Sequence, residues 1–237
     1  MANSYFQFKQ FRIDQGDCAM KVTTEGCLLG AWIPESKPTR ILDIGAGTGL
    51  LSLMLAQRFD CPIDALEIDP AAAKQASENI KSSPWHDQVN VIEADLFDFS
   101  VKENQIKYDL IISNPPFFSG SLQANQTAKN QAKHDSDVFD KQRFAVALKG
   151  LLSENGSAFV LYPAHEQLLF EQAVEREGLE IGKVLTIYNQ PNADVFRVIS
   201  QVKLGGDFLP HEKLNIRKGN RHTPEFESLL SAYYLKL

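Results

Sequence analysis

The sequence contains no long apolar segment. No stretch of its residues approaches the roughly 20 consecutive apolar residues that a membrane-spanning helix needs. The residues up to Asp14 carry Lys9 and Arg12 among scattered aromatic residues, so they lack the apolar run of a secretory signal peptide. These absences predict a cytoplasmic protein that has no membrane partner.

Cysteine is also scarce. The chain has three cysteines, Cys18, Cys27 and Cys61, an odd number with no Cys-x-x-Cys pair among them. Such a set favours reduced thiols over disulfides or a zinc site, so we expect no metal centre.

Positive charge is in deficit, with a formal net charge of −6. Because phosphate contacts need many Lys and Arg residues, this balance argues against a protein that coats nucleic acid non-specifically. It leaves room for a local basic patch, although a solvated surface is the ordinary explanation of such clusters. The candidate clusters are Lys9, Arg12 and Lys21; Lys129, Lys133, Lys141 and Arg143; and Arg217, Lys218, Arg221 and His222.

From residue 39 onward, short β-rich runs alternate with helical patterns, which is typical of βαβ units and a mostly parallel sheet. The final two β-rich runs leave no room for a helix between them and predict an antiparallel hairpin. Strands are expected over 40–44, 63–68, 89–92, 108–113, 157–162, 180–188 and 195–204, and helices over 50–58, 70–80, 139–152 and 165–177. The pattern predicts a Rossmann-like α/β fold, with a seven-stranded sheet and helices on both faces.

We expect a single domain in three segments, because 237 residues with 43% hydrophobic content can form one substantial core. Residues 1–38 would be an N-terminal segment packed over the ligand site, residues 39–205 the core, and residues 206–237 an extension of the same domain. The polar stretch 119–137 is predicted to be a long loop, and Glu154–Gly156 a turn.

A glycine-rich loop joins the first core strand to its helix. It reads Gly45-Ala46-Gly47-Thr48-Gly49, and glycine allows the backbone to turn tightly and approach a ligand. A dinucleotide-binding loop would have its third glycine one residue later, where Leu50 stands. The spacing therefore favours a nucleoside with an amino-acid tail over NAD or FAD.

Acidic residues end the first three core strands. Glu67 is placed to accept hydrogen bonds from ribose hydroxyls, and Asp43 to meet an ammonium group. Asp95 is placed to accept a hydrogen bond from an adenine amine, with Ile68 and Leu96 flanking the ring. Each acid taken alone is more often a helix cap or a surface charge, and Asp95 in particular could be just a turn residue.

The motif Asn114-Pro115-Pro116-Phe117 follows the strand over 108–113. An amino group on an aromatic ring is a poor nucleophile, because its lone pair is delocalised. The Asn114 side-chain oxygen and the Pro115 carbonyl could each accept one N–H and so aim the lone pair at a methyl donor. Two prolines hold the backbone in place, and Phe117 offers a face on which an extruded base can stack. The other reading is a strand-ending turn with an aromatic residue in the core.

These residues resemble the N6-adenine and related amino methyltransferases that share a [DNS]-P-P-[YFW] motif, over about residues 39–165. Residues 8–11, 18–26, 28–32, 110–117 and 232–235 are also similar to the bacterial tRNA1(Val) N6-adenine methyltransferases. The resemblance implies a class I methyltransferase fold, S-adenosylmethionine as cofactor, and methylation of adenine 37, beside the anticodon of a valine tRNA.

By this resemblance, the segment 21–26 covers the methionine end of the cofactor, and the methyl group is transferred directly, without a metal. The implied cofactor-binding residues are Lys21, Thr24, Asp43, Gly45, Ala46, Gly47, Glu67, Ile68, Asp95, Leu96 and Asn114. Two positions depart from the family pattern: Phe117 replaces the Tyr, and Glu25 the Asp, that many members have.

Several alternatives remain open at this point. Asn-Pro-Pro-Phe also occurs in guanine-N2 methyltransferases of ribosomal RNA, and a glutamine amide of a protein presents a similar planar nitrogen. A nicotinamide oxidoreductase and a non-catalytic RNA-binding or scaffold protein are more distant readings. For a monomeric tRNA enzyme we expect phosphate contacts from Lys129, Lys133, Arg217 and Arg221.

Overall fold

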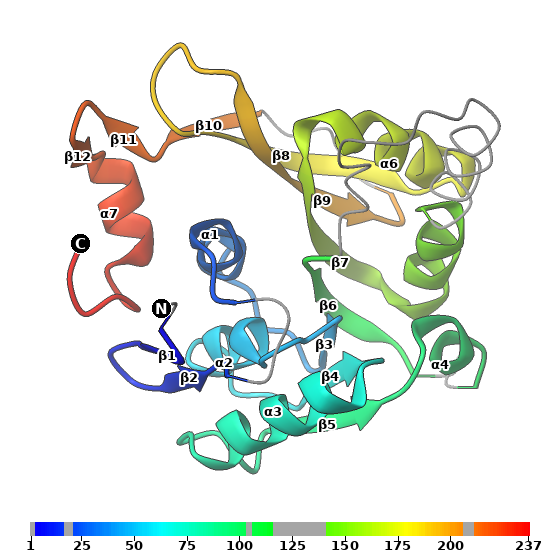
Figure 1. The fold of residues 1–237 in the computed structure, drawn as a ribbon. Helices are drawn as coiled ribbons and strands as arrows, with labels where there is room; N and C mark the ends of the chain where they lie inside the picture. The colour runs from blue at the N-terminus through cyan, green and yellow to red at the C-terminus, as the bar shows by residue number, and fades with distance from the viewer. Residues whose placement is uncertain (1–2, 17–20, 103–105, 116–140, 206–210) are drawn as a thin grey trace, which may run out of the picture.

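The computed structural model describes residues 3–16, 21–102, 106–115, 141–205 and 211–237 (Figure 1). Its main sheet has eight strands in the order β10-β8-β9-β7-β6-β3-β4-β5. These strands are β3 (Ile41–Ile44), β4 (Ile63–Glu67), β5 (Val89–Glu93), β6 (Tyr108–Ser113), β7 (Leu152–Pro163), β8 (Glu180–Tyr188), β9 (Val195–Lys203) and β10 (Glu212–Asn215). The labelled helices are α1 (Thr24–Trp32), α2 (Leu50–Ala56), α3 (Pro70–Lys81), α4 (Leu96–Lys102), α6 (Ala164–Arg176) and α7 (Pro224–Leu230), and residues 141–151 form a further helix.

Seven of these eight strands run in the same direction. Strands β3 to β7 pair in parallel, β10 pairs in parallel with β8, and only β9 runs antiparallel, between β7 and β8. The predicted parallel sheet and its antiparallel β8–β9 pair are confirmed. The carboxyl ends of β3 to β8 and of β10 therefore meet at one edge of the sheet, which we call the carboxyl edge.

The prediction of seven strands was one too low. The eighth strand, β10, belongs to the C-terminal extension and pairs Leu214 with Ile187 of β8. This strand is only four residues long, and Leu214 is its single buried residue. Its sequence therefore shows too little alternation of apolar and polar residues to indicate a strand.

Helices cover both faces of the sheet, as predicted, and each face has its own hydrophobic core. On one face, α1, α2, α3 and α7 contribute to a cluster that includes Leu28, Met54 and Phe226. On the other face, α4, α6 and the helix over 141–151 contribute to a cluster that includes Leu148 and Phe170. Both sides of the central strands are therefore buried, which explains their continuous apolar sequences.

Local signals set the start of α3. The side chain of Asp69 accepts a hydrogen bond from the Ala72 backbone N–H at 2.8 Å, and Pro70 occupies the first turn. Both are favourable, because the first N–H groups of a helix have no partner within the helix and proline lacks that N–H. The helix begins at the predicted residue.

The predicted turn at Glu154–Gly156 was wrong. Strand β7 begins at Leu152, and its register with β6 shifts between the pairs Tyr108–Leu152 and Leu110–Ser157. The turn-forming residues therefore lie in an irregularity within a strand, where extra residues can be inserted without ending the pairing.

The two ends of the chain pack together, as Figure 1 shows. Strands β1 (Tyr5–Gln7) and β2 (Arg12–Asp14) form a hairpin, and Phe8 forms a bridge with Tyr234. The Asn79 amide donates to the carbonyls of Asp14 and Thr48, both at 2.9 Å. These bonds tie the end of the hairpin to the glycine-rich loop.

No helix in the described part of the chain is long and apolar enough to cross a membrane.

Candidate functional site

The glycine-rich loop lies at the carboxyl edge, directly after β3. Gly45, Gly47 and Gly49 have φ angles of 72°, 56° and 80°, all in the left-handed region that other residues rarely adopt. A Cβ on Gly45 or Gly47 would meet nothing within 4 Å, so the strain comes from the backbone conformation. Ala46, between them, is buried. The loop is therefore bent as its sequence predicted.

Asp43 lies in β3 beneath this loop, fully buried. Its Oδ2 accepts hydrogen bonds from the Ser52 backbone N–H at 3.0 Å and the Ser52 hydroxyl at 2.6 Å. Its Oδ1 is buried and has no hydrogen-bond partner among the residues that the structure describes. Burial, opposed by the bonds from Ser52 and assisted by the nearby charge of Glu67, raises the pKa of Asp43 to about 7. A buried carboxylate oxygen without a donor is suited to a cationic group at this edge.

Glu67, at the end of β4, braces the loop. Its Oε2 accepts from the Gly47 N–H at 2.8 Å, and its Oε1 accepts from the Asp69 N–H at 2.9 Å. A carboxylate has about four acceptor sites, so two remain for the hydroxyls of a ribose. The expected ligand role therefore coexists with a structural one that the sequence did not reveal.

Asp95 has a structural role as well. Its Oδ1 accepts from the N–H groups of Phe97 at 2.8 Å and Asp98 at 3.2 Å, which caps the start of α4. This is the helix-cap alternative considered for Asp95 above. Asp95 also lines a cavity, so cofactor binding by its carboxylate stays a prediction.

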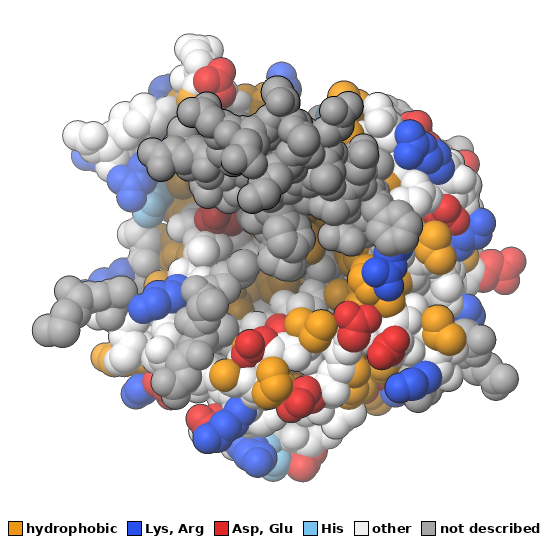
Figure 2. Space-filling view, turned by 45° about the vertical axis from the view of Figure 1, so that its right-hand side comes forward, with side chains coloured by type: hydrophobic (Ala, Val, Ile, Leu, Met, Phe, Trp, Pro, Cys, Tyr) orange, Lys and Arg blue, Asp and Glu red, His pale blue; other side chains and the backbone are white. Residues whose placement is uncertain are grey.

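This cavity of about 340 Å³ lies at the carboxyl edge. Ile68 contributes to its wall, and the residue is 62% exposed. Figure 2 shows a hollow with hydrophobic side chains inside it and acidic and hydrophobic side chains below it. The lining residues are Ile44, Gly45, Leu66, Ile68, Ala94, Asp95, Leu96, Phe97, Ser113, Pro115, Lys141, Phe144 and Tyr162.

Eight of these lining residues were not predicted as site residues: Ile44, Leu66, Ala94, Phe97, Ser113, Lys141, Phe144 and Tyr162. Lys141 and Phe144 are three residues apart on one helix, so they share a face. The guanidinium of Arg143 lies 3.7 Å from the centre of the Phe97 ring. Helical spacing could have grouped Lys141 with Phe144, but only the fold brings them to the cavity.

Asn114 lies beside the glycine-rich loop. The register of β3 and β6 pairs Ile44 with Ser113, and the Ser113 hydroxyl donates to the Ile44 carbonyl at 2.9 Å. Helix α1 approaches from the other side, where a Cβ on Gly26 would lie 3.9 Å from Asn114 Nδ2. Pro116 and Phe117 lie outside the described residues.

The two predicted cofactor-binding residues of the N-terminal segment do not line this cavity. Lys21 is exposed, and Thr24 is the first residue of α1, whose N-cap is Thr23. The Thr24 side chain interacts instead with the hydroxyl of Tyr234, in the C-terminal tail, and Cys27 interacts with the same hydroxyl. Burial raises the pKa of this hydroxyl.

Two of the four predicted RNA contacts lie on a small β ribbon. Strands β11 (Arg217–Lys218) and β12 (Arg221–His222) pair antiparallel, and both Arg217 and Arg221 are exposed. The ribbon follows β10, and the Arg217 N–H donates to the Asn189 carbonyl just after β8. It therefore leaves the sheet at the carboxyl edge. Lys129 and Lys133 lie outside the described residues.

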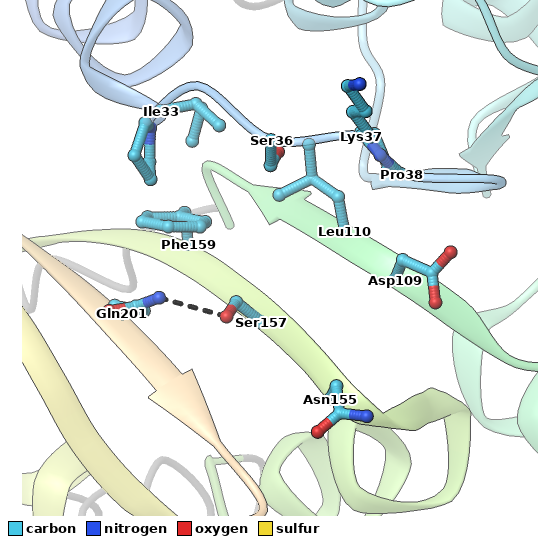
Figure 3. A pocket seen from close by; sticks show the side chains of 11 residues that line it. Ile33, Ser36, Lys37, Pro38, Asp109, Leu110, Asn155, Ser157, Phe159 and Gln201 are labelled. Carbon is cyan, nitrogen blue, oxygen red and sulfur yellow. Dashed lines mark hydrogen bonds between the residues drawn. The ribbon is translucent and has the colours of Figure 1, made fainter. Parts of the chain in front are cut away.

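A second cavity of about 400 Å³ lies near the amino ends of the strands (Figure 3). Phe159, Leu110 and the Gln201–Ser157 hydrogen bond of 2.9 Å lie there. None of the predicted site residues that the structure describes lines it. Because parallel sheets bind ligands at their carboxyl ends, the cavity near Asn114 is the candidate active site. No group of three or more His, Cys, Asp or Glu residues in the described ranges could hold a metal ion.

Comparisons with known proteins agree with this geometry. The sequence model of the family "Methyltransferase small domain" matches residues 18–154. A tRNA1(Val) (adenine(37)-N6)-methyltransferase of Bacteroides fragilis is 40% identical over 238 residues, covering all of both chains. Proteins of the same name from Cytophaga hutchinsonii and Trichodesmium erythraeum are each 39% identical, also over the whole of both chains. The chain belongs to the tRNA1(Val) (adenine(37)-N6)-methyltransferase family.

Solved structures confirm the fold. A protein described as a predicted O-methyltransferase from Agrobacterium tumefaciens superposes with a TM-score of 0.68 at 16% identity, over 87% of this chain and 95% of that one. A ribosomal protein L11 methylase from Lactobacillus delbrueckii gives 0.57 at 17% identity, over 81% and 83%. Family and fold together confirm the predicted enzyme class, a methyltransferase that uses S-adenosylmethionine, over the oxidoreductase and scaffold alternatives.

Proposed function

We propose that this protein methylates N6 of adenine 37, next to the anticodon, in tRNA1(Val). Two observations support this proposal: the names of the relatives that match the whole chain, and the side-by-side placement of Asn114 and the glycine-rich loop. The second observation carries the chemistry, because a methyl donor held by the loop would face an amino group held by Asn114.

In this proposal the cofactor supplies a methyl group on a sulfonium. The backbone of Gly45, Ala46 and Gly47 would hold its tail, Asp43 would face its ammonium, and Glu67 would accept hydrogen bonds from its ribose. Ile68 and Leu96 enclose its adenine. The oxygens of Asn114 and Pro115 accept the two N–H groups of the target amine, so that its lone pair is directed at the methyl carbon. After transfer, the extra proton on nitrogen leaves to solvent.

The product of the reaction tests this proposal. The protein is incubated with methyl-labelled cofactor and with the total RNA and protein of cells that lack the modification, and the RNA is then separated and digested to nucleosides. We expect N6-methyladenosine as the labelled nucleoside and a valine tRNA as the labelled RNA. N2-methylguanosine, or label on a protein glutamine, would instead support the corresponding alternative.

We further propose that the β11–β12 ribbon binds tRNA phosphates through Arg217 and Arg221. Both side chains are exposed at the carboxyl edge, the edge that also carries Asn114. Four strand spacings separate β6 from β10, about 19 Å at 4.8 Å per strand. A polymer held by the ribbon can therefore reach Asn114 within one chain, so a monomer is sufficient for the proposal.

Charge reversal tests the ribbon. We expect the double variant Arg217→Glu, Arg221→Glu to weaken tRNA binding about 10-fold or more at low salt. The slope of log Kd against the logarithm of the salt concentration should also fall by the amount that corresponds to about two lost phosphate contacts. Lys81→Glu is the matched control, because Lys81 is exposed at the C-terminal end of α3, away from the carboxyl edge. An unaltered salt slope in the double variant would contradict the proposal.

A further inference from the structure

The candidate active site contains a buried ion pair outside the residues assigned above. Lys141 Nζ contacts Glu166 Oε2, and the two residues are only 8% and 7% exposed. Lys141 Nζ also lies 5.6 Å from the centre of the Tyr162 ring. The pair joins the helix over 141–151 to the first turn of α6, and both Lys141 and Tyr162 line the cavity.

Stability alone does not account for this pair. Removing two charges from water costs about as much as their attraction returns, so a well-packed apolar pair is often equally or more stable. A lysine kept in the wall of a largely apolar cavity therefore calls for another explanation. Its ammonium carries three donors, of which the contact with Glu166 uses one.

Two polar groups of the cavity lining, those of Asp95 and Lys141, are complementary to a purine. Asp95 supplies a carboxylate acceptor, while the Ser113 hydroxyl already donates to Ile44. Lys141 supplies a charged donor. Adenine presents an exocyclic amine, which donates, and ring nitrogens, which accept. An acceptor and a donor in one cavity could therefore bind both kinds of group on the same ring.

We propose that Lys141 is a specificity-determining residue that donates a hydrogen bond to a ring nitrogen of the cofactor's adenine, and that Glu166 positions it. The inference rests on the proposed use of this cavity for the cofactor nucleoside. Glu166 has a second effect, because S-adenosylmethionine is a cation and an uncompensated lysine would repel it. The carboxylate keeps the donor in the wall and cancels its charge.

Deaza analogues test the hydrogen bond directly. Calorimetry gives the Kd of S-adenosylhomocysteine and of its 1-deaza, 3-deaza and 7-deaza forms, in each of which one ring nitrogen is replaced by C–H. For the wild type we expect one analogue to bind about 10-fold or more weakly, the loss typical of a charge-assisted hydrogen bond. In Lys141→Met this penalty should shrink to within about twofold. Lys149→Met is the control, since Lys149 is exposed on the same helix and donates to the Glu177 carbonyl.

A double variant covers the case in which Lys141→Met fails to fold because Glu166 is left buried without a partner. Lys141→Met combined with Glu166→Leu removes both buried charges at once, and it should show the same loss of discrimination between analogues. In Glu166→Gln, we expect the affinity for S-adenosylmethionine to fall more than that for the uncharged-sulfur product.

The outcomes separate this inference from the proposed function. If the wild type binds S-adenosylhomocysteine but all three analogues bind as tightly, or if the penalty persists without Lys141, the inference is overturned and the proposed function stands. If the wild type does not bind S-adenosylhomocysteine, both are overturned.

Discussion

Asn114→Ala should lower kcat by about 10²- to 10⁴-fold while the Kd of S-adenosylhomocysteine stays within a few-fold of wild type. The expected loss is large because the Asn114 oxygen orients a nitrogen whose lone pair is otherwise delocalised, a contact that matters most in the transition state. The cofactor affinity is expected to persist because Asp43 is held by hydrogen bonds from Ser52, and Glu67 is held by a hydrogen bond from Gly47 of the glycine-rich loop.

Single-turnover kinetics with saturating tRNA and calorimetry with S-adenosylhomocysteine separate the two effects. Asn114→Asp should recover part of the rate, because it keeps an oxygen acceptor at the same position. Asn155→Ala is the control, since Asn155 is exposed in the irregular part of β7. Wild-type turnover in Asn114→Ala would rule out the assigned role.

Asp43→Asn should stabilise the free protein at alkaline pH and yet weaken cofactor binding. Burial raises the pKa of Asp43 to about 7, above the ordinary value of an aspartate in the unfolded chain, so the carboxyl ionises more easily in the unfolded state than in the folded one. The folded state therefore loses stability as the pH rises from about 4 through about 7. Asparagine has no charge to bury and can still accept the bonds from Ser52. At pH 9 we expect a gain of about 2 to 4 kcal/mol in the free energy of unfolding.

Thermal or denaturant unfolding at pH 5 and pH 9 measures this effect, and the gain should be larger at pH 9. Calorimetry on the wild type should show S-adenosylhomocysteine binding more tightly as the pH rises through 7, because the ligand ammonium favours ionised Asp43. Asp43→Asn should lack that pH dependence. A stability difference that is the same at both pH values would contradict the assignment of the raised pKa to Asp43.

The glycine spacing and the strand ends could be predicted because they depend on local chemistry. Three alternate glycines between an apolar run and a helical pattern permit few conformations, and the φ angles of Gly45, Gly47 and Gly49 agree with that expectation. The apolar runs of β3, β4 and β6 predicted buried parallel strands for the same kind of reason. Because parallel strands end at the same edge of a sheet, the expected strand order was enough to predict that Asn114 and Gly45 lie close together.

The second roles of the acidic residues could not be predicted in this way. Whether Asp95 caps α4 or faces a ligand depends on backbone N–H groups whose direction is set only when the helix forms. Glu67 braces Gly47 because β3 and β4 are neighbours, a contact between residues 20 apart in the chain.

The sequence by itself determined the order of the core strands β3 to β9, the left-handed glycine bend and the identity of the motif that follows β6, because each depends on short-range sterics or on periodic burial. Only the tertiary structure decided that Lys141, Glu166 and Tyr162 meet at the cavity wall, that β10 extends the sheet and brings Arg217 to the carboxyl edge, and that the two chain ends pack together. These contacts join residues far apart in the chain, and their free energy comes from burial and charge pairing that exist only once the sheet and its covering helices are assembled.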